Sequence, residues 1–111
     1  MRKEKYFQLW LSCADKAEAD KIAKVLLDKK LIACAKQLPV RSSFTWENET
    51  STSEEIWMSM ESREDSFDEI EAEVAKIHSY GTFVLTATPI TKISKKAKKW
   101  LNQSLKQQEQ V

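Results

Sequence analysis

The sequence predicts a single α+β domain, residues 1–111, in which helices pack against one β-sheet. Three observations support this fold class. The chain has 111 residues, too few for two cores that each bury enough apolar surface. Hydrophobic residues make up 41% of it and charged residues 32%, a balance typical of a folded domain with a polar exterior. Segments with a two-residue period alternate with segments of helical period, which favours strands and helices mixed along the chain.

The first predicted elements are a strand and a capped helix. Residues 6–13 alternate between apolar and more polar side chains, as expected for a strand with one apolar face. Asp15 and Glu18 then form a capping box, in which Asp15 accepts from the helix backbone and Glu18 reaches back toward it. Apolar residues follow at helical spacing: Ala19, Ile22, Ala23, Leu26 and Leu27. The helix is predicted to end near Lys29 and Lys30, because cations are favourable at a helix C-terminus.

A long hairpin is predicted next. Its first strand covers residues 31–46 and is interrupted at Pro39, which lacks a ladder donor and therefore indicates an edge, bend or bulge. Residues 47–50 form the tip, where Asn48 is the residue best suited to positive φ in the absence of glycine. Apolar side chains on alternate positions mark the returning strand: Ile56, Met58 and Met60.

A helix, a strand and a final helix complete the order. Ser62 or Ser66 is predicted to cap the second helix. Its apolar positions recur at three- and four-residue steps: Phe67, Ile70, Val74 and Ile77. Residues 82–88 predict a strand that stops at Pro89. The last helix has its own apolar stripe: Ile93, Ala97, Trp100, Leu101 and Leu105. Residues 107–111 are predicted to fray. Right-handed crossovers turn this βαββαβ order into a ferredoxin-like sandwich plus a C-terminal helix.

Composition excludes several function classes. The only glycine, Gly81, leaves no Gly-rich loop for a nucleotide phosphate. The net charge is +1, but residues 47–73 are strongly acidic and residues 92–106 are rich in lysine, so local surfaces must guide any argument about partners. Two cysteines and no segment resembling a secretory signal predict a cytoplasmic protein. No stretch approaches the roughly 18 apolar residues of a membrane span, so we expect no membrane partner.

Two residues form a candidate metal site. Cys13 ends the first predicted strand and His78 is the only histidine. Thiolate and imidazole together can bind a soft divalent or cuprous ion. Each residue also fits a structural role, Cys13 as a small core side chain and His78 as a favourable cation at a helix end. Their spacing matches no zinc-finger pattern, so both interpretations stay open. Cys34, which lies between two alanines, is interpreted as a core residue.

Catalysis and nucleic-acid binding find less support. Acid pairs such as Glu54 and Glu55 have no partner base in the pattern and are interpreted as solvated, and no nucleophile motif indicates an enzyme. The lysines of residues 92–99, next to Trp100, resemble a phosphate-contacting patch. On a helix, however, Trp100 falls in the apolar stripe and the lysines point outward. This favours a solvated face, or salt bridges between subunits, over nucleic acid.

Six motifs are specific in their combined order and spacing: Leu11-Ser12-Cys13, the segment 26–35, Trp46-Glu47, His78-Ser79-Tyr80, Thr88-Pro89-Ile90 and Trp100-Leu101-Asn102. Through them the chain resembles the CutA divalent-cation-tolerance family over roughly residues 7–105. The resemblance implies a homotrimer with the fold and assembly of PII signalling proteins and a part in tolerance to copper and other divalent metals. It also implies a site for copper or another divalent metal ion at Cys13 and His78.

The chain departs from the family pattern in a few places. A second histidine that the family often has is replaced by Ile77, a Pro-Glu pair by Phe83 and Val84, and a lysine by Glu61. The resemblance implies a polar cleft between subunits, which these replacements would alter. The sequence therefore predicts a non-enzymatic, metal-binding or metal-responsive homotrimer. The alternative is a PII-like regulatory module that binds a small ligand or a protein partner between subunits. An acylphosphatase-type enzyme of the same topology would need a Gly-rich anion loop, which the chain lacks.

Overall fold

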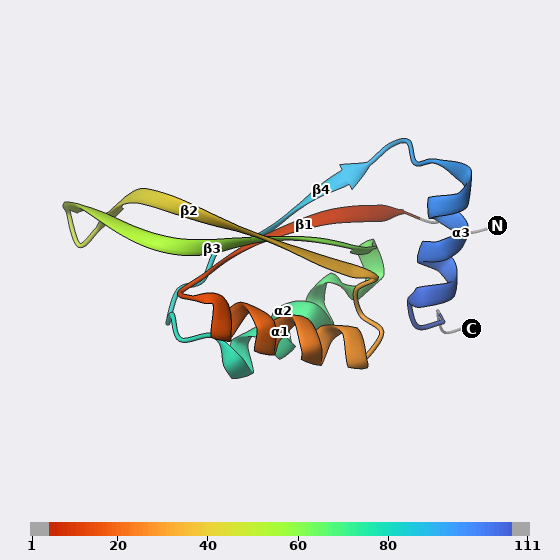
Figure 1. Cartoon of the computed structure of the whole chain (residues 1–111), viewed down its shortest axis with the longest axis horizontal. Coiled ribbons are helices and arrows are strands. Elements are labelled where there is room, and N and C mark those ends of the chain that lie inside the picture. The colour runs from red at the N-terminus through yellow and green to blue at the C-terminus, as the bar shows by residue number, and fades with distance from the viewer. Residues whose placement is uncertain (1–4, 108–111) are drawn as a thin grey trace.

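The computed structural model describes residues 5–107. Figure 1 shows one sheet with two helices on one face and a third helix across its end. The strands are β1 (Tyr6–Cys13), β2 (Cys34–Trp46), β3 (Glu49–Arg63) and β4 (Leu85–Ile90). The helices are α1 (Lys16–Asp28), α2 (Phe67–Ile77) and α3 (Lys95–Ser104), with a short 3-10 turn, η1 (Glu64–Ser66), before α2. The predicted α+β class and order of elements are confirmed. Of the residues predicted to fray, 108–111 lie outside the described residues.

The sheet has the strand order β2-β3-β1-β4, and every neighbouring pair is antiparallel. This is the ferredoxin-like arrangement that the sequence predicts. The register places Tyr6 opposite Arg63 and Cys13 opposite Ile56. Because β1 and β3 run in opposite directions, the helices that follow them start at opposite ends of the sheet. The end of α2 therefore returns to the start of α1.

The core lies between the sheet and the helices α1 and α2. Leu9, Leu11 and Cys13 of β1 are fully buried there, as the alternation of the strand predicts. They pack with buried side chains of β3 and the two helices: Met58, Met60, Ile22, Leu26, Ile70 and Val74. Full burial of one such large side chain stabilises the fold by about 1.5–3 kcal/mol. Gln8, Trp10 and Ser12 lie on the other face of the sheet, here called the outer face.

The hairpin of β2 and β3 is more regular than predicted. The predicted interruption at Pro39 is wrong, since pairing continues through Pro39 opposite Ile56. The reason is that β2 is an edge strand of the described sheet and pairs with another strand on one side only. The Pro39 nitrogen has no hydrogen to donate, and on the unpaired side of an edge strand this breaks no ladder hydrogen bond. An edge position was one of the three explanations of Pro39 that the sequence left open. The strand begins at Cys34 instead of residue 31, because Leu31 and Ile32 turn into the core.

The hairpin tip matches its prediction. Glu47 and Asn48 form the two-residue turn, with φ values of 50° and 66°. Positive φ at both positions is the geometry that suits the right-handed twist of the flanking strands. Figure 1 shows this hairpin extending well beyond the helices, and it accounts for the long dimension of a molecule that measures 49 × 27 × 23 Å.

Two further boundaries need correction. The predicted strand 82–88 is shifted, since β4 begins at Leu85 and continues through Pro89, which lies opposite Phe7. β4 is the other edge of the sheet, so it tolerates proline as β2 does.

Ser62 does not cap α2 but is buried in β3, where its hydroxyl donates to the carbonyl of Leu31. Ser66 occupies the N-cap position of α2 without a side-chain cap hydrogen bond.

Helix α3 is attached to the end of the sheet by buried contacts. Leu101 and Leu105 are buried, and the guanidinium of Arg63 donates to the carbonyl of Lys106 at 2.9 Å and to Asn102 Oδ1 at 3.3 Å. Trp100, predicted on the buried stripe, is largely exposed. In the described part of the chain, no helix has both the length and the apolar character needed to cross a bilayer.

Candidate metal centre and outer-face cavity

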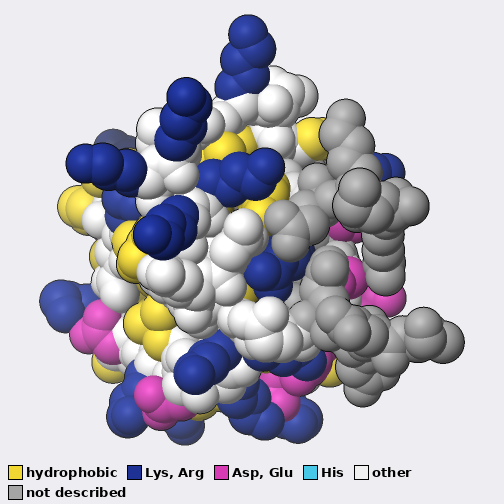
Figure 2. Space-filling model, turned by 90° about the vertical axis from the view of Figure 1, so that its right-hand side faces the viewer, with side chains coloured by type: hydrophobic (Ala, Val, Ile, Leu, Met, Phe, Trp, Pro, Cys, Tyr) yellow, Lys and Arg dark blue, Asp and Glu magenta, His cyan; other side chains and the backbone are white. Residues whose placement is uncertain are grey.

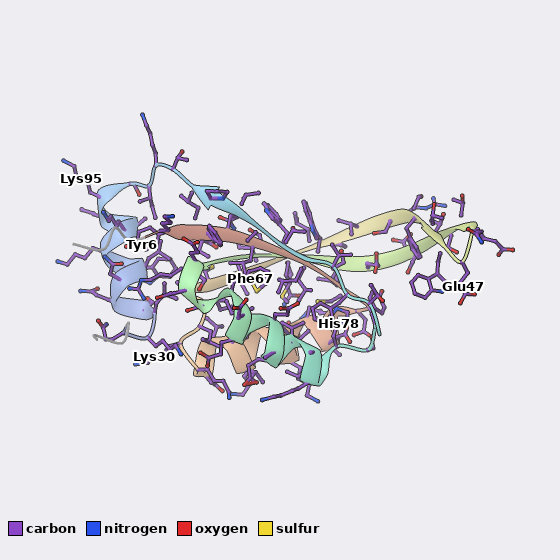
Figure 3. The ribbon with its side chains drawn as sticks, turned by 180° about the vertical axis from the view of Figure 1, so that it is seen from behind. Tyr6, Lys30, Glu47, Phe67, His78 and Lys95 are labelled. Carbon is purple, nitrogen blue, oxygen red and sulfur yellow. The ribbon has the colours of Figure 1, made fainter. Side chains whose placement is uncertain are left out.

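The topology brings three potential metal ligands together. Cys13 is the last residue of β1, Glu18 lies in the first turn of α1, and His78 directly follows α2. One ligand atom from each lies within 4.8 Å of the others. The structure thus places the two sequence-predicted residues side by side and adds Glu18, which the sequence indicated only as part of a capping box. Figure 3 shows His78 at the end of α2, beside the start of α1.

The hydrogen bonds of His78 determine which ring nitrogen carries the lone pair. Its side chain has no exposed surface. Nε2 lies 2.7 Å from the carbonyl oxygen of Ser12, which can only accept, so Nε2 carries the proton and donates. Nδ1 accepts the backbone N–H of Tyr80 at 3.1 Å. Nδ1 therefore carries the ring's lone pair, which a cation could take only in place of the Tyr80 N–H, and it lies 3.8 Å from Glu18 Oε2.

The carboxylate of Glu18 connects three parts of the chain. Oε2 accepts the backbone N–H of Ala14 at 2.8 Å, and Oε1 accepts that of Ser79 at 2.6 Å. The capping box is confirmed on the Asp15 side, whose carboxylate accepts the N–H of Glu18 at 2.8 Å. Burial raises the pKa of Glu18, but the hydrogen bonds from Ala14 and Ser79 and the nearby His78 outweigh it and leave the pKa lowered. Glu18 is thus an anion at neutral pH.

The thiol of Cys13 is protonated at neutral pH. Burial raises its pKa to about 12, with smaller contributions from the negative charges of Glu18, Glu55 and Asp15. The thiol is the softest donor of the cluster, and it can bind a metal only after losing its proton. A metal ion at Cys13 would therefore displace one proton.

Aromatic rings enclose the histidine. The ring of Phe83 stacks on His78 with centroids 5.2 Å apart, and that of Tyr80 lies 4.8 Å away. The hydroxyl of Tyr80 donates to the buried carboxylate of Glu55, and burial followed by this bond raises the pKa of Tyr80. Of the positions that depart from the family pattern, Phe83 thus covers the histidine, whereas Val84 is exposed.

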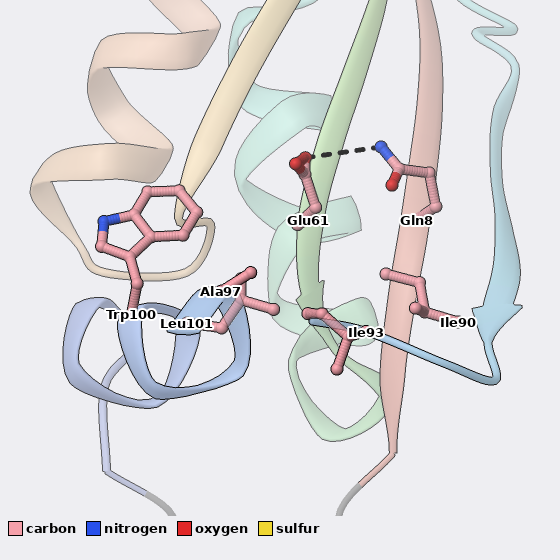
Figure 4. Close-up of a pocket in the computed structure, with 7 residues that line it drawn as sticks. All are labelled: Gln8, Glu61, Ile90, Ile93, Ala97, Trp100 and Leu101. Atoms are coloured by element: carbon pink, nitrogen blue, oxygen red, sulfur yellow. Dashed lines mark hydrogen bonds between the residues drawn. The ribbon is translucent and has the colours of Figure 1, made fainter. Parts of the chain in front are cut away.

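A separate cavity lies on the outer face, between the sheet and α3. Its volume is about 230 Å³. Figure 4 shows its lining, which is mostly apolar: Gln8, Glu61, Ile90, Ile93, Ala97, Trp100 and Leu101. Gln8 donates to Glu61 at 3.4 Å, and Lys36 of β2 pairs with Glu61 at 3.3 Å and lies 3.4 Å from the sulfur of Cys34. Figure 2 views this end of the molecule and shows lysine and arginine side chains standing around apolar surface.

Comparisons with known proteins agree with the fold. The sequence matches the family described as CutA1 divalent ion tolerance protein over residues 7–104. A relative from Archaeoglobus fulgidus, the "Divalent-cation tolerance protein CutA", is 34% identical over 97 residues, which cover 87% of this chain and 95% of the relative. A relative of the same description from Pyrococcus horikoshii is 27% identical over 92 residues, covering 83% and 90%.

Solved structures superpose closely on the chain. The structure described as the periplasmic divalent cation tolerance protein CutA from Archaeoglobus fulgidus has a TM-score of 0.89 at 33% identity and covers 91% of this chain and 99% of its own. CutA1 from Oryza sativa has a TM-score of 0.90 at 24% identity, covers 94% and 96%, and supports the fold alone. With the family match extending from the first strand to the last helix, the chain belongs to the CutA1 divalent ion tolerance protein family.

Proposed function

We propose that this protein contributes to divalent-cation tolerance by binding a metal ion, copper or another divalent metal, at Cys13 and His78. The observation that carries the proposal is the position of the two side chains, which are 65 positions apart in the sequence and meet within 4.8 Å. The family name connects the protein with divalent ions, and the cluster offers the kind of donors that such ions bind.

The residues fit such an ion. A thiolate and an imidazole suit zinc and copper. A metal-binding histidine usually donates its other ring N–H to a carbonyl or carboxylate, which fixes the ring and its tautomer. The bond from His78 Nε2 to the carbonyl of Ser12 has this form, and it leaves Nδ1 for the metal. A bound ion would take the place of the Tyr80 N–H at Nδ1 and of the thiol proton at Cys13.

The experiment is a competitive titration of Zn²⁺ and Cu²⁺ against the wild type and single variants. C13A and H78Q should each weaken binding by at least about tenfold, because each removes one ligand. C34A is the matched control, since it removes the other cysteine. Cys34 is paired with Glu61 and Cys13 with Ile56, so their partner residues are about 17 Å apart along β3. Unchanged affinity in both C13A and H78Q would refute the site.

We further propose that three copies associate through the outer face of the sheet. Trp57 on this face is 38% exposed and Leu38, opposite it, is 57% exposed. Trp57 also stacks on Trp10 with ring centroids 4.4 Å apart, which builds a rigid aromatic surface. Exposed apolar surface of this kind marks an interface in a soluble protein. Association would also cover the open edges of β2 and β4.

A second function is favoured by the cavity beside α3. An apolar lining with a few polar groups is typical of a site for a small organic ligand. In this alternative the protein is a PII-like regulatory module, and the ligand binds where subunits meet. Thermal unfolding separates the two functions, because a compound that binds only the native state raises the melting temperature. If metals raise the melting temperature of the wild type but not of C13A, the metal function is supported. If small organic ligands raise it in the wild type but not in A97W, the regulatory module is supported.

We propose a cytoplasmic location and no enzymatic activity. The thiols of Cys13 and Cys34 are both free, which suits a reducing compartment. The relative from Archaeoglobus fulgidus is described as periplasmic, so fractionation of cells that express the tagged native gene is the deciding experiment. Recovery with a cytoplasmic marker supports the proposal, and release with the periplasmic fraction contradicts it.

A further inference from the structure

We infer that Glu18 is a third ligand of the proposed metal site and that the site therefore selects a borderline divalent cation of the Zn²⁺ class over Cu⁺. The inference rests on the proposed function of Cys13 and His78. It concerns a residue whose sequence pattern indicated only a helix cap, and it specifies the kind of ion that the site binds.

The distance between Glu18 and His78 allows one ion to contact both. Zn–N bonds are about 2.0–2.1 Å long and Zn–O bonds about 2.0–2.2 Å, so one nitrogen and one oxygen ligand of the same ion are separated by at most about 4.3 Å. Oε2 of Glu18 and Nδ1 of His78 are 3.8 Å apart. Nδ1 is also the ring nitrogen that carries the lone pair. That lone pair accepts the backbone N–H of Tyr80 at 3.1 Å, so an ion can lie between these two atoms once Tyr80 gives up this bond.

The hydrogen bonds of Glu18 leave room for a metal. Each carboxylate oxygen has two lone pairs, and the backbone N–H groups of Ala14 and Ser79 occupy one on each oxygen. A ligating carboxylate is commonly oriented by hydrogen bonds of this kind. The side chain is only 10% exposed, so its orientation is fixed by the protein on several sides.

The capping role alone does not explain this arrangement. A capping-box glutamate binds the N-cap N–H of its own helix. Glu18 instead reaches Ala14, the residue before the cap, and Ser79 across the molecule, next to His78. Its carboxylate is thereby directed toward the histidine ring and the end of β1, where Cys13 lies.

The charges of the three donors favour a divalent ion. Thiolate and carboxylate contribute one negative charge each, and His78 binds as the neutral imidazole, so an ion of charge +2 is balanced. A thiolate, an imidazole and a carboxylate are the ligand types that Zn²⁺ accepts. Cu⁺ prefers soft sulfur ligands, so a carboxylate adds little for it. Removing the carboxylate should therefore weaken Zn²⁺ binding much more than Cu⁺ binding.

The test compares E18Q with D20N. Gln keeps an acceptor for one backbone N–H but removes the charge and the carboxylate ligand. Asp20 lies on the same helix and is exposed, with Lys16 and Gln37 as partners, so D20N controls for the loss of one charge. Zn²⁺ affinity should fall by at least about tenfold in E18Q and by less than about twofold in D20N. Cu⁺ affinity, measured without oxygen, should change by less than about threefold in E18Q.

The outcomes separate this inference from the function on which it rests. If C13A and H78Q lose affinity for Zn²⁺ but E18Q binds Zn²⁺ as tightly as the wild type, Glu18 is a structural residue only and the inference is wrong. If none of the three variants loses affinity, the proposed site itself is wrong. If E18Q loses as much affinity for Cu⁺ as for Zn²⁺, the proposed selectivity for Zn²⁺ over Cu⁺ is wrong.

If E18Q does not fold, a crystal of the wild type soaked with Zn²⁺ decides the matter. A carboxylate oxygen of Glu18 at about 2.0–2.2 Å from the anomalous peak supports the inference. Water in that position, or no peak near Cys13, overturns it.

Discussion

The carboxylate of Glu18 accepts the backbone N–H of Ser79 at 2.6 Å across 61 positions of the chain. This bond joins the first turn of α1 to the segment that leaves α2. It places His78 where its ring meets the end of β1. The metal site proposed for this protein depends on that connection, and so do the first two predictions.

The first prediction concerns stability and pH. The folded-state pKa of Glu18 is lowered, so its ionisation stabilises the native state above its unfolded pKa, and this contribution is lost as pH falls through the folded pKa. E18Q without metal should unfold at lower denaturant than the wild type at pH 7, by about 1–3 kcal/mol, since the hydrogen bonds of Ala14 and Ser79 lose their charged acceptor. The difference should shrink as the pH falls below the ordinary glutamate pKa of 4.5 and through the lowered pKa of Glu18. Urea unfolding at both pH values measures it, and a difference that grows in acid would contradict the assignment.

The second prediction concerns the pH dependence of metal binding. The pKa of Cys13 is raised to about 12, so one proton must leave whenever an ion binds the thiol. Apparent Zn²⁺ affinity of the wild type should therefore rise about tenfold per pH unit between pH 6.5 and 8. Competitive titration in buffers that do not bind zinc measures this slope. The same slope is expected in C34A, and a flat profile in the wild type would show that Cys13 is not a ligand.

The third prediction concerns association of subunits. W57K places a charge on the outer face of the sheet and should convert trimers to monomers, as measured by light scattering coupled to size-exclusion chromatography. L27K is the matched control, because Leu27 is also exposed but lies on α1, away from the outer face. A W57K protein that stays trimeric, or an L27K protein that dissociates, would exclude the outer face as the interface.

The fourth prediction concerns the attachment of α3. Arg63 is buried and donates to Lys106 and Asn102, so R63M should leave these acceptors without their donor. The expected loss is about 1–3 kcal/mol. Hydrogen exchange should show α3 opening first while β1 keeps its protection, because the core beneath α1 and α2 does not include Arg63. Uniform loss of protection across the sheet would contradict a local role.

Much of the fold could be predicted because the periodicities are clear. The alternation of residues 6–13 predicted which face of β1 is buried. The hairpin tip has no glycine, so Asn48 was predicted to adopt positive φ, and it does. The errors concern tertiary context. A proline interrupts the hydrogen-bond ladder of a central strand but is tolerated in an edge strand. Pro39 and Pro89 both lie in edge strands, and no local pattern states which strands will be edges.

The candidate site was predictable only in part. Cys13 and His78 were named as a pair because they are rare residue types at the ends of elements, and the structure brings them together. Glu18 was assigned to a helix cap, and its approach to His78 depends on how α2 returns beside α1, which a local motif does not contain. The outer-face cavity brings together β1, β3, β4 and α3, so its lining could not be predicted from any single segment.

The most direct test of the central claim is the optical spectrum of the Co²⁺-loaded protein. A thiolate ligand gives an intense charge-transfer band in the near ultraviolet, which nitrogen and oxygen ligands do not give. The account predicts this band in the wild type and in C34A and its absence in C13A. A band that persists in C13A and disappears in C34A would place the metal at the other cysteine and contradict the account.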